Sequence, residues 1–532
     1  MLRLRLLIGF ALISNAYLLN IENENPVVTT PLGEIKGVIL TTVLGKSIYS
    51  FRGIRYAKPP VGELRFKPPV PVEKWDDIYD GTKDGSVCPQ PSRIDTVSED
   101  CLFLNVYTTK LPHGKDNPKR PVMVYFYAGG FYSGAGSSKW EGPDYLLDQN
   151  IVLVTLNYRL GSLGFLSTGD ALAPGNNGIK DQVIALRWVR DNIATFGGDP
   201  NLVTIFGYSA GGTSVTLHMV SPMSKGLFHR AIFMSCSAFG KWPMETHQFS
   251  LAQKQARLLN CPDDTSANII KCLKTKSAEE LGNSLDGFSE FGYDPIIVWS
   301  PVIEPDFGQE RFLTENAREL LLKGEFAKVP VMGGISALEF AVSALDVIGN
   351  ATLLKEMDED FERVAPIAFI YERDTENSKH ISKELRKYYL GDGPLNNASL
   401  SGLEKLYAES VTGFDVNRGQ YSHYYLPGTE TPYGVIHHDD LIYLFYISPW
   451  FPRFNATSPD YVMVKKLTKL LTNFASTGNP IPQPNDALDN IDWIPYTNKN
   501  KEYLDIGKKL VMKKNLFEDR YAKWEELFPL PQ

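Results

Sequence analysis

Short apolar runs rich in β-branched and aromatic residues alternate along the chain with segments of helical periodicity. The runs that predict strands are 122–127 (VMVYFY), 151–156 (IVLVTL), 202–206 (LVTIF) and 231–234 (AIFM). Most are apolar on both faces, which is typical of central strands covered by helices. Between two of them, residues 178–195 have helical spacing and end at the turn FGGDP. This order predicts an α/β fold with a mostly parallel sheet flanked by helices.

The domain organisation is predicted from the absence of segments that would separate domains. A length of 532 residues is compatible with about three domains, but large α/β enzymes often build one continuous sheet. The sequence contains no internal repeat, low-complexity tract or Pro/Ser-rich linker. We therefore expect residues 17–532 to form one domain with large loop insertions.

Composition narrows the class of protein. Hydrophobic residues make up 43% of the chain and charged residues 22%, as in globular proteins. The net charge of −8 comes without a stripe of Lys and Arg interleaved with aromatics, so a nucleic-acid partner is not expected. No cysteine lies in a CxxC pair or beside a histidine at zinc spacing, and no metal or other cofactor is predicted.

The first residues have the pattern of a secretory signal peptide. Arg3 and Arg5 precede an apolar run from Leu6 to Ile13, and Ser14 and Ala16 give a small-x-small cleavage site. The run is much shorter than the roughly 20 residues that cross a bilayer. Cleavage after Ala16 would release a secreted, extracellular protein without a membrane anchor.

The five cysteines fit an oxidising compartment. Their spacing indicates two short disulfides, Cys88 with Cys101 and Cys261 with Cys272, and leaves Cys236 over. Spacing does not fix connectivity, and five buried thiols are the alternative. Three sequons provide candidate glycosylation sites at Asn350, Asn397 and Asn455.

The stretch TIFGYSAGGT carries the strongest chemical signal, centred on Ser209. A Gly-x-Ser-x-Gly pattern is weak by itself, because chance supplies it about once in four chains of this composition. Here it follows a predicted strand and precedes a predicted helix, which is the setting of the nucleophile elbow of an α/β-hydrolase fold. The start of that helix offers backbone N–H groups and positive potential to a developing oxyanion. The alternative is an ordinary glycine turn.

A nucleophilic serine needs a histidine base and an acid, which follow it in the order acid, then histidine, in α/β-hydrolases. His437 is the best base candidate because a glycine-containing loop leads there into an apolar segment, and His438 is its rival. Glu339 follows an apolar run and a glycine pair, whereas Glu304 is expected to be a turn residue beside Pro305. The other downstream histidines follow the serine too closely or lie in polar surroundings: His218, His229, His247, His380 and His423.

A glycine-rich loop after an earlier strand supplies oxyanion donors in lipases and esterases. Gly129 and Gly130 follow the run 122–127 and fit this role. A plain glycine loop is the alternative, because glycine pairs are common. Three motifs in the expected order make the combination much stronger than any one of them.

These residues resemble the type-B carboxylesterase/cholinesterase family, over nearly the whole mature chain. The matching stretches are FRGIRYAKPP (51–60), SEDCLFLN (98–105), NYRLG (157–161), FGGDP, GYSAGG and LTNFASTGNP (471–480). The resemblance implies Ser209 as nucleophile, Glu339 as acid and His437 as base. It also implies an oxyanion hole formed by Gly129, Gly130 and Ala210 and both proposed disulfides. The chain looks most like arthropod secreted esterases.

Departures from the family pattern bear on the substrate. Family members commonly have Glu at the position of Tyr208, and juvenile hormone esterases usually have Gln there. Cholinesterases carry a choline-binding tryptophan in a long loop, but only twelve residues separate Cys88 from Cys101 here and none is Trp. A quaternary ammonium substrate would lose about 0.5–2 kcal/mol without that contact. Ala128 and Cys236 stand where many members have Gly, and Trp242 is similar to the family's acyl-pocket tryptophan.

The predicted function is therefore that of a secreted serine carboxylesterase that hydrolyses neutral, apolar esters through an acyl-enzyme. Its expected partner is a small-molecule ester. One alternative is a non-catalytic adhesion ectodomain of the same fold, although such relatives typically lose the serine or the histidine. A second alternative is an esterase specific for a hormone or a pheromone.

Overall fold

The computed structural model describes residues 25–91, 95–240, 244, 248–336, 339–412 and 437–529. The predicted signal peptide, Trp242, His247 and His423 lie outside these residues. No helix within the described ranges is long and apolar enough to cross a membrane.

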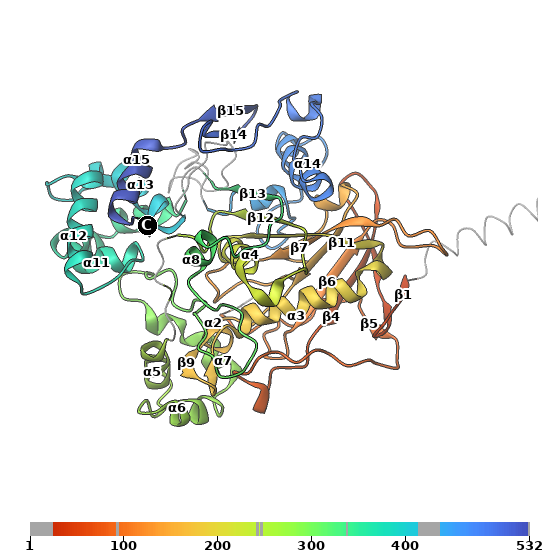
Figure 1. Cartoon of the computed structure of the whole chain (residues 1–532), viewed down its shortest axis with the longest axis horizontal. Coiled ribbons are helices and arrows are strands. Elements are labelled where there is room, and N and C mark those ends of the chain that lie inside the picture. Colours follow the sequence, from red (N-terminus) through yellow and green to blue (C-terminus); the bar gives the residue numbers. More distant parts are fainter. Residues whose placement is uncertain are drawn as a thin grey trace, which may run out of the picture.

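A central sheet of eight strands organises the molecule (Figure 1). In spatial order its strands are β3 (Val38–Thr41), β4 (Ser47–Arg55), β6 (Phe103–Thr108), β8 (Val152–Leu156), β7 (Arg120–Phe126), β11 (Gly198–Tyr208), β12 (Arg230–Met234) and β13 (Val331–Gly334). The strands from β8 to β13 pair in parallel, whereas β3, β4, β6 and β8 pair antiparallel. The α/β prediction with a mostly parallel sheet is confirmed, with an antiparallel edge that the sequence pattern did not reveal.

The four predicted strands correspond to β7, β8, β11 and β12. Their apolar side chains are buried, as the doubly apolar pattern requires, and form the main hydrophobic core. β11 is longer than predicted at both ends. Its polar start was interpreted as a turn, but Gly198 pairs with Arg120 of β7, and Tyr208 at its other end pairs with Met234 of β12.

The predicted crossover helix is present as α3 (Asn177–Asn192). It ends earlier than expected because residues 193–196 tighten into a 3₁₀ turn. Gly197 follows with φ of 83°, which glycine adopts at little cost. The turn returns the chain to the sheet at β11, next to β7.

Besides α3, which contacts β11, two helices pack directly on the strands that carry the candidate site. These are α4 (Ala210–Val220), against β11 and β12, and α14 (Tyr461–Thr477), against β7 and β11. Other helices lie in the connections between strands. They are α2 (Gly161–Phe165) after β8, and α5 (Phe249–Leu258), α6 (Ser266–Leu273), α7 (Ala278–Gly282) and α8 (Ala317–Leu322) between β12 and β13.

A second apolar cluster lies to one side of the sheet (Figure 1). It is built from α9 (Ala341–Gly349), α10 (Ala351–Glu359), α11 (Phe361–Ala368), α12 (Glu376–Leu385), α13 (Leu400–Thr412) and α15 (Glu518–Leu527). These helices belong to the connection that follows β13 and to the end of the chain.

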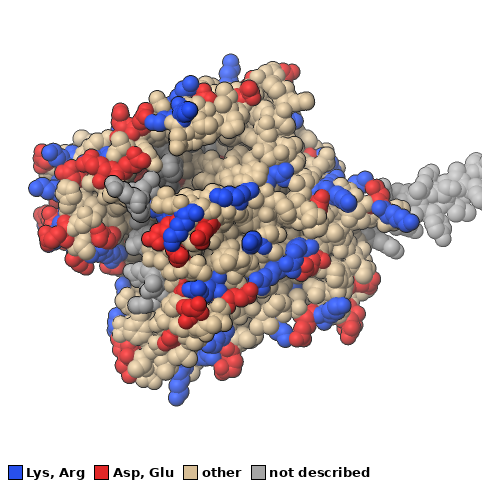
Figure 2. All heavy atoms as spheres, viewed as in Figure 1, with Lys and Arg blue, Asp and Glu red and all other residues tan. Residues whose placement is uncertain are grey.

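Small strands and disulfides complete the fold. The strands outside the central sheet are β1 (Val27–Thr30), β2 (Gly33–Lys36), β5 (Tyr79–Asp80), β9 (Ser167–Asp170), β10 (Ala173–Pro174), β14 (Glu502–Ile506) and β15 (Leu510–Lys514). Both predicted disulfides, Cys88–Cys101 and Cys261–Cys272, are formed, and Cys236 is buried outside them. On the face in Figure 2, charges of both signs are interspersed.

Candidate active site

Ser209 lies at the sharp turn between β11 and α4, where the elbow motif places it. Its backbone has φ of 55° and ψ of −120°, a conformation that non-glycine residues rarely adopt. The Ser209 N–H donates to the carbonyl of Met234 at 2.9 Å, and the Ser209 carbonyl accepts from the N–H of Thr213 at 2.9 Å. These bonds hold the strained turn in place between the strand end and the first turn of α4.

The glycines of the motif are required by close packing. A Cβ atom on Gly207 would lie 2.4 Å from the carbonyl carbon of Gly211. On Gly211 it would lie 1.9 Å from the carbonyl oxygen of Phe126, the last residue of β7. Larger side chains at these positions would push the elbow away from the neighbouring strand.

Glu339 and His437 meet although they are far apart in sequence. The Oε2 atom of Glu339 lies 2.5 Å from Nδ1 of His437, and its Oε1 accepts from the N–H of Ser336 at 2.6 Å. Glu339 is fully buried and follows the end of β13, the edge strand next to β12. The ring of Phe340 covers the His437 ring, with centroids 3.9 Å apart. Both side chains are therefore held at the carboxyl end of the parallel strands.

Burial shapes the protonation of this pair. It raises the pKa of Glu339 to about 8, an effect that the Ser336 N–H partly offsets, and it lowers the pKa of His437 to about 3. Both directions reflect the cost of charge in a dry environment. When the Glu339 carboxylate is ionised, the hydrogen between Oε2 and Nδ1 belongs to a neutral imidazole. The Nε2 atom of His437 is then unprotonated, as a general base requires.

The glycine loop follows β7 at the same end of the sheet. Gly129 and Gly130 have φ of 115° and 58°, and the Gly129 carbonyl accepts from the N–H groups of Tyr132 and Ser133. Among the described residues, none accepts a hydrogen bond from the N–H groups of Gly129, Gly130 or Ala210. These three donors are available to an oxyanion.

The competing candidates for base and acid, His438 and Glu304, make different contacts. His438 is exposed and makes no hydrogen bond with Glu339 among the described residues, whereas Nδ1 of His437 does. Glu304 is not the turn residue that we expected. It is buried and pairs with Lys180 at 2.5 Å while accepting from the N–H of Phe312 at 2.8 Å. Its carboxylate therefore stabilises the fold through a buried ion pair, which a single sequence gives no means to predict.

His218 is also structural. Its Nδ1 lies 2.6 Å from the hydroxyl of Ser224 and its Nε2 lies 3.0 Å from Oε1 of Gln182. Burial lowers its pKa to about 3. The prediction that it does not serve as the base agrees with these contacts.

Comparison with known proteins adds independent evidence. The model of the carboxylesterase family matches residues 24–524. The chain belongs to the carboxylesterase family. It is 36% identical to juvenile hormone esterase of Tribolium castaneum, over 87% of this chain and 85% of that protein. It is 34% identical to venom carboxylesterase-6 of Apis mellifera, over 90% of this chain and 89% of that protein.

A solved structure extends the likeness to the fold. Juvenile hormone esterase from Manduca sexta, with OTFP covalently attached, has a TM-score of 0.80 and 26% identity. The match covers 95% of this chain and 100% of that one. The α/β-hydrolase fold and the predicted family are confirmed. The names of the relatives support a carboxylic ester hydrolase.

The sequence does not predict the contact of Tyr208 with the histidine loop in this carboxylesterase. Tyr208 was noted only as a departure from the family pattern. Its fully buried hydroxyl accepts from the N–H of His438 at 2.7 Å and lies 3.4 Å from Nδ1 of His437. Because Tyr208 adjoins Ser209 in the chain, this contact brings the histidine loop next to the elbow.

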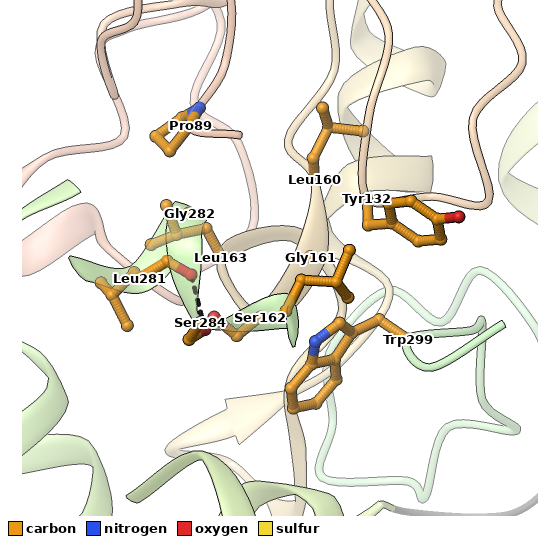
Figure 3. A pocket seen from close by; sticks show the side chains of 11 residues that line it. Pro89, Tyr132, Leu160, Gly161, Ser162, Leu163, Leu281, Gly282, Ser284 and Trp299 are labelled. Atoms are coloured by element: carbon orange, nitrogen blue, oxygen red, sulfur yellow. Dashed lines mark hydrogen bonds between the residues drawn. The ribbon is translucent and has the colours of Figure 1, made fainter. Parts of the chain in front are cut away.

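A small pocket lies beside the glycine loop (Figure 3). Its lining includes Pro89, Tyr132, Ser162, Leu281 and Trp299. The Ser162 hydroxyl is buried and has no partner among the described residues. The pocket has room for about one water molecule, and a water there can bind this hydroxyl. The same small volume does not accommodate an acyl chain. No group of metal-ligating side chains occurs in the described part of this carboxylesterase.

Proposed function

We propose that this carboxylesterase hydrolyses neutral carboxylic esters with Ser209 as the nucleophile and an acyl-enzyme as the intermediate. The observation that carries the proposal is the buried pair of Glu339 and His437, with Nδ1 and Oε2 2.5 Å apart. The contact of Tyr208 with both histidines ties this pair to the elbow. The covalent attachment of OTFP in the structure of the Manduca sexta relative agrees with covalent chemistry in this family.

Acylation follows from the protonation of the pair. The Oγ atom of Ser209 attacks the ester carbonyl carbon while Nε2 of His437 takes its proton. The N–H groups of Gly129, Gly130 and Ala210 bind the resulting oxyanion. When the carbon–oxygen bond to the alcohol breaks, the protonated Nε2 gives its proton to the leaving oxygen. Ser209 then carries the acyl group.

Deacylation repeats these steps with water. His437 takes a proton from water as the water oxygen attacks the acyl carbon, and Ser209 recovers that proton when the carboxylic acid leaves. Glu339 stabilises the imidazolium in both halves. Buried at the same end of the sheet, the pair offers this stabilisation without reorganisation.

The substrate class rests on what surrounds the serine. Tyr208 places a neutral aromatic side chain where many relatives have a carboxylate, and the short segment between Cys88 and Cys101 has no tryptophan. Both features favour uncharged, apolar esters over choline esters. Two relatives are named juvenile hormone esterases, and a hormone ester is a second candidate within the same apolar class.

We also propose that the protein is exported and glycosylated. The signal-peptide pattern of residues 1–16 supports export, and Asn350, Asn397 and Asn455 are all exposed. After expression in insect cells, the medium should contain a protein whose mass falls when N-glycans are removed enzymatically. Retention of an unmodified protein inside the cells would contradict this part of the proposal.

Hydrolysis of a series of p-nitrophenyl esters tests the function. We expect turnover of acetyl to octanoyl esters, and lower kcat/KM for acetylthiocholine than for an uncharged thioester of the same acyl group. A folded protein that hydrolyses none of these esters would favour the alternative of a non-catalytic binding domain.

A further inference from the structure

The hydroxyl of Tyr208 lies behind the candidate histidine base and contacts the loop that carries it. Its oxygen accepts from the backbone N–H of His438 at 2.7 Å and lies 3.4 Å from Nδ1 of His437. The Tyr208 ring packs against both imidazoles, with centroid distances of 4.9 Å to His437 and 5.2 Å to His438. The side chain thus restrains the loop through both its ring and its oxygen.

The proton of this hydroxyl has a second possible partner. Asp440 follows three residues after His437, and its Oδ1 is buried without a partner among the described residues. Burial raises the pKa of Asp440 to about 7, and the charge of Glu339 adds to this, whereas a hydrogen bond from the Tyr208 side chain lowers it. An ionised Asp440 can accept the single proton of the Tyr208 hydroxyl.

That direction decides what the oxygen of Tyr208 can do. A phenol has one proton to donate and lone pairs that accept. With the proton directed to Asp440, the oxygen offers only lone pairs to His437, so the contact is favourable when Nδ1 carries hydrogen. That tautomer leaves Nε2 unprotonated. A phenol that donated to Nδ1 would instead favour hydrogen on Nε2 and block proton uptake from Ser209.

We propose that Tyr208 is a positioning residue for the candidate base. Its hydroxyl oxygen shares the Nδ1 hydrogen of His437 with Glu339 and anchors the next peptide N–H, which fixes the orientation and the tautomer of the ring. The inference rests on the proposed function of Ser209 and His437. A neutral phenol does this without adding a third carboxylate beside Glu339 and Asp440.

The variant Tyr208→Phe tests the inference because it keeps the ring and removes only the hydroxyl. We expect kcat to fall about tenfold with KM changed less than twofold, since the contact acts on the base and not on substrate binding. The rate of labelling by a fluorophosphonate should fall in parallel. The low-field proton resonance of the His437–Glu339 hydrogen bond should shift, because Nδ1 loses one of its two acceptors.

Tyr371→Phe is the matched control. Tyr371 is buried in the second apolar cluster, and its hydroxyl lies 2.7 Å from that of Ser382. Removing this hydroxyl should lower stability without changing kcat or the low-field resonance. A Tyr208→Phe enzyme with wild-type kcat, labelling rate and resonance would overturn the inference, while an active wild type would leave the proposed function intact.

Asp440→Asn provides a second test if Tyr208→Phe does not fold. An amide can donate to the Tyr208 oxygen, which frees the phenol proton to turn toward Nδ1 of His437. We expect kcat to fall and the low-field resonance to weaken. Unchanged values for this variant would also overturn the inference. Loss of turnover in the wild type itself would instead contradict the proposed function.

Discussion

The Nδ1 atom of His437 lies 2.5 Å from Oε2 of Glu339, across 98 positions of sequence. The contact supports the prediction of His437 over His438 and of Glu339 over Glu304, two choices that spacing alone left open. Both partners are buried, and the Ser336 N–H holds the second carboxylate oxygen. The carboxylate is therefore fixed beside Nδ1 of the histidine, and Nε2 is the ring nitrogen that remains for a proton from Ser209 in the proposed mechanism.

Replacing the candidate acid should impair proton transfer by His437 without unfolding the protein. In Glu339→Gln the amide can donate to Nδ1 and favour the wrong histidine tautomer, so we expect kcat to fall by about 10³–10⁴. Steady-state hydrolysis of p-nitrophenyl butyrate measures this.

Glu304→Gln is the matched control, since it changes a second buried glutamate in the same way. It breaks the ion pair with Lys180 and should cost about 3–5 kcal/mol of unfolding free energy while kcat stays near the wild-type value. If the two variants lost activity equally at temperatures where both are folded, the assignment of the acid would be wrong.

The pH dependence should reveal the buried base. Burial lowers the pKa of His437 from 6.5 to about 3, so its unprotonated form persists in more acid solution than an ordinary histidine allows. We expect the steep acid loss of kcat/KM to lie well below pH 6.5. Circular dichroism at each pH separates this loss from unfolding. A steep acid limb centred at 6.5 or above would contradict the burial argument.

A shallow step near neutral pH should precede that loss. The pKa of Asp440 is raised to about 7 by burial and by Glu339, and its ionised form is the one that accepts from Tyr208. As the pH falls through 7, protonation of Asp440 would release the Tyr208 proton toward His437 and lower kcat a few-fold. The step should be missing in Tyr208→Phe, and its persistence there would assign it to another group.

The elbow should tolerate no side chain at Gly211. In Gly211→Ala the added carbon would lie 1.9 Å from the carbonyl oxygen of Phe126, so the backbone must shift. We expect a loss of about 1–3 kcal/mol in stability together with most of the activity. Gly349→Ala is the control, because the space around Gly349 is open and it ends α9. Differential scanning calorimetry and initial rates should leave the control unchanged and show both losses in Gly211→Ala; a variant at 211 as stable and active as wild type would be inconsistent with this packing.

Thiol counting checks the covalent framework. Two disulfides leave Cys236, which is buried and whose pKa burial raises to about 12. The native protein should react slowly with an aromatic disulfide reagent, and the protein unfolded without reductant should show one thiol per chain. Three or five thiols in the unfolded, unreduced protein would contradict the pairing.

Sequence pattern predicted those features that depend on neighbours along the chain. Doubly apolar runs located β7, β8, β11 and β12, and the glycines around Ser209 indicated the strained turn that the structure contains. Local signals also placed Glu339 after a strand end, where the structure has it beside His437.

Features that depend on distant partners could not be predicted in this way. The antiparallel edge of the sheet depends on pairings between β3, β4, β6 and β8, which periodicity does not specify. Glu304 looked like a turn residue because its partner Lys180 lies 124 positions away. Tyr208 looked like a mere departure from the family because its contact with His438 spans 230 positions.

The central claim is that Ser209 becomes covalently modified during catalysis, and mass spectrometry of the labelled protein tests it most directly. After reaction with a fluorophosphonate and digestion, we expect one adduct per chain, on the peptide that contains Ser209, in step with the loss of esterase activity. Ser209→Ala should fold, take up no label and lose about 10⁴–10⁶ in kcat. An adduct on another residue, or full ester hydrolysis by Ser209→Ala, would contradict the account.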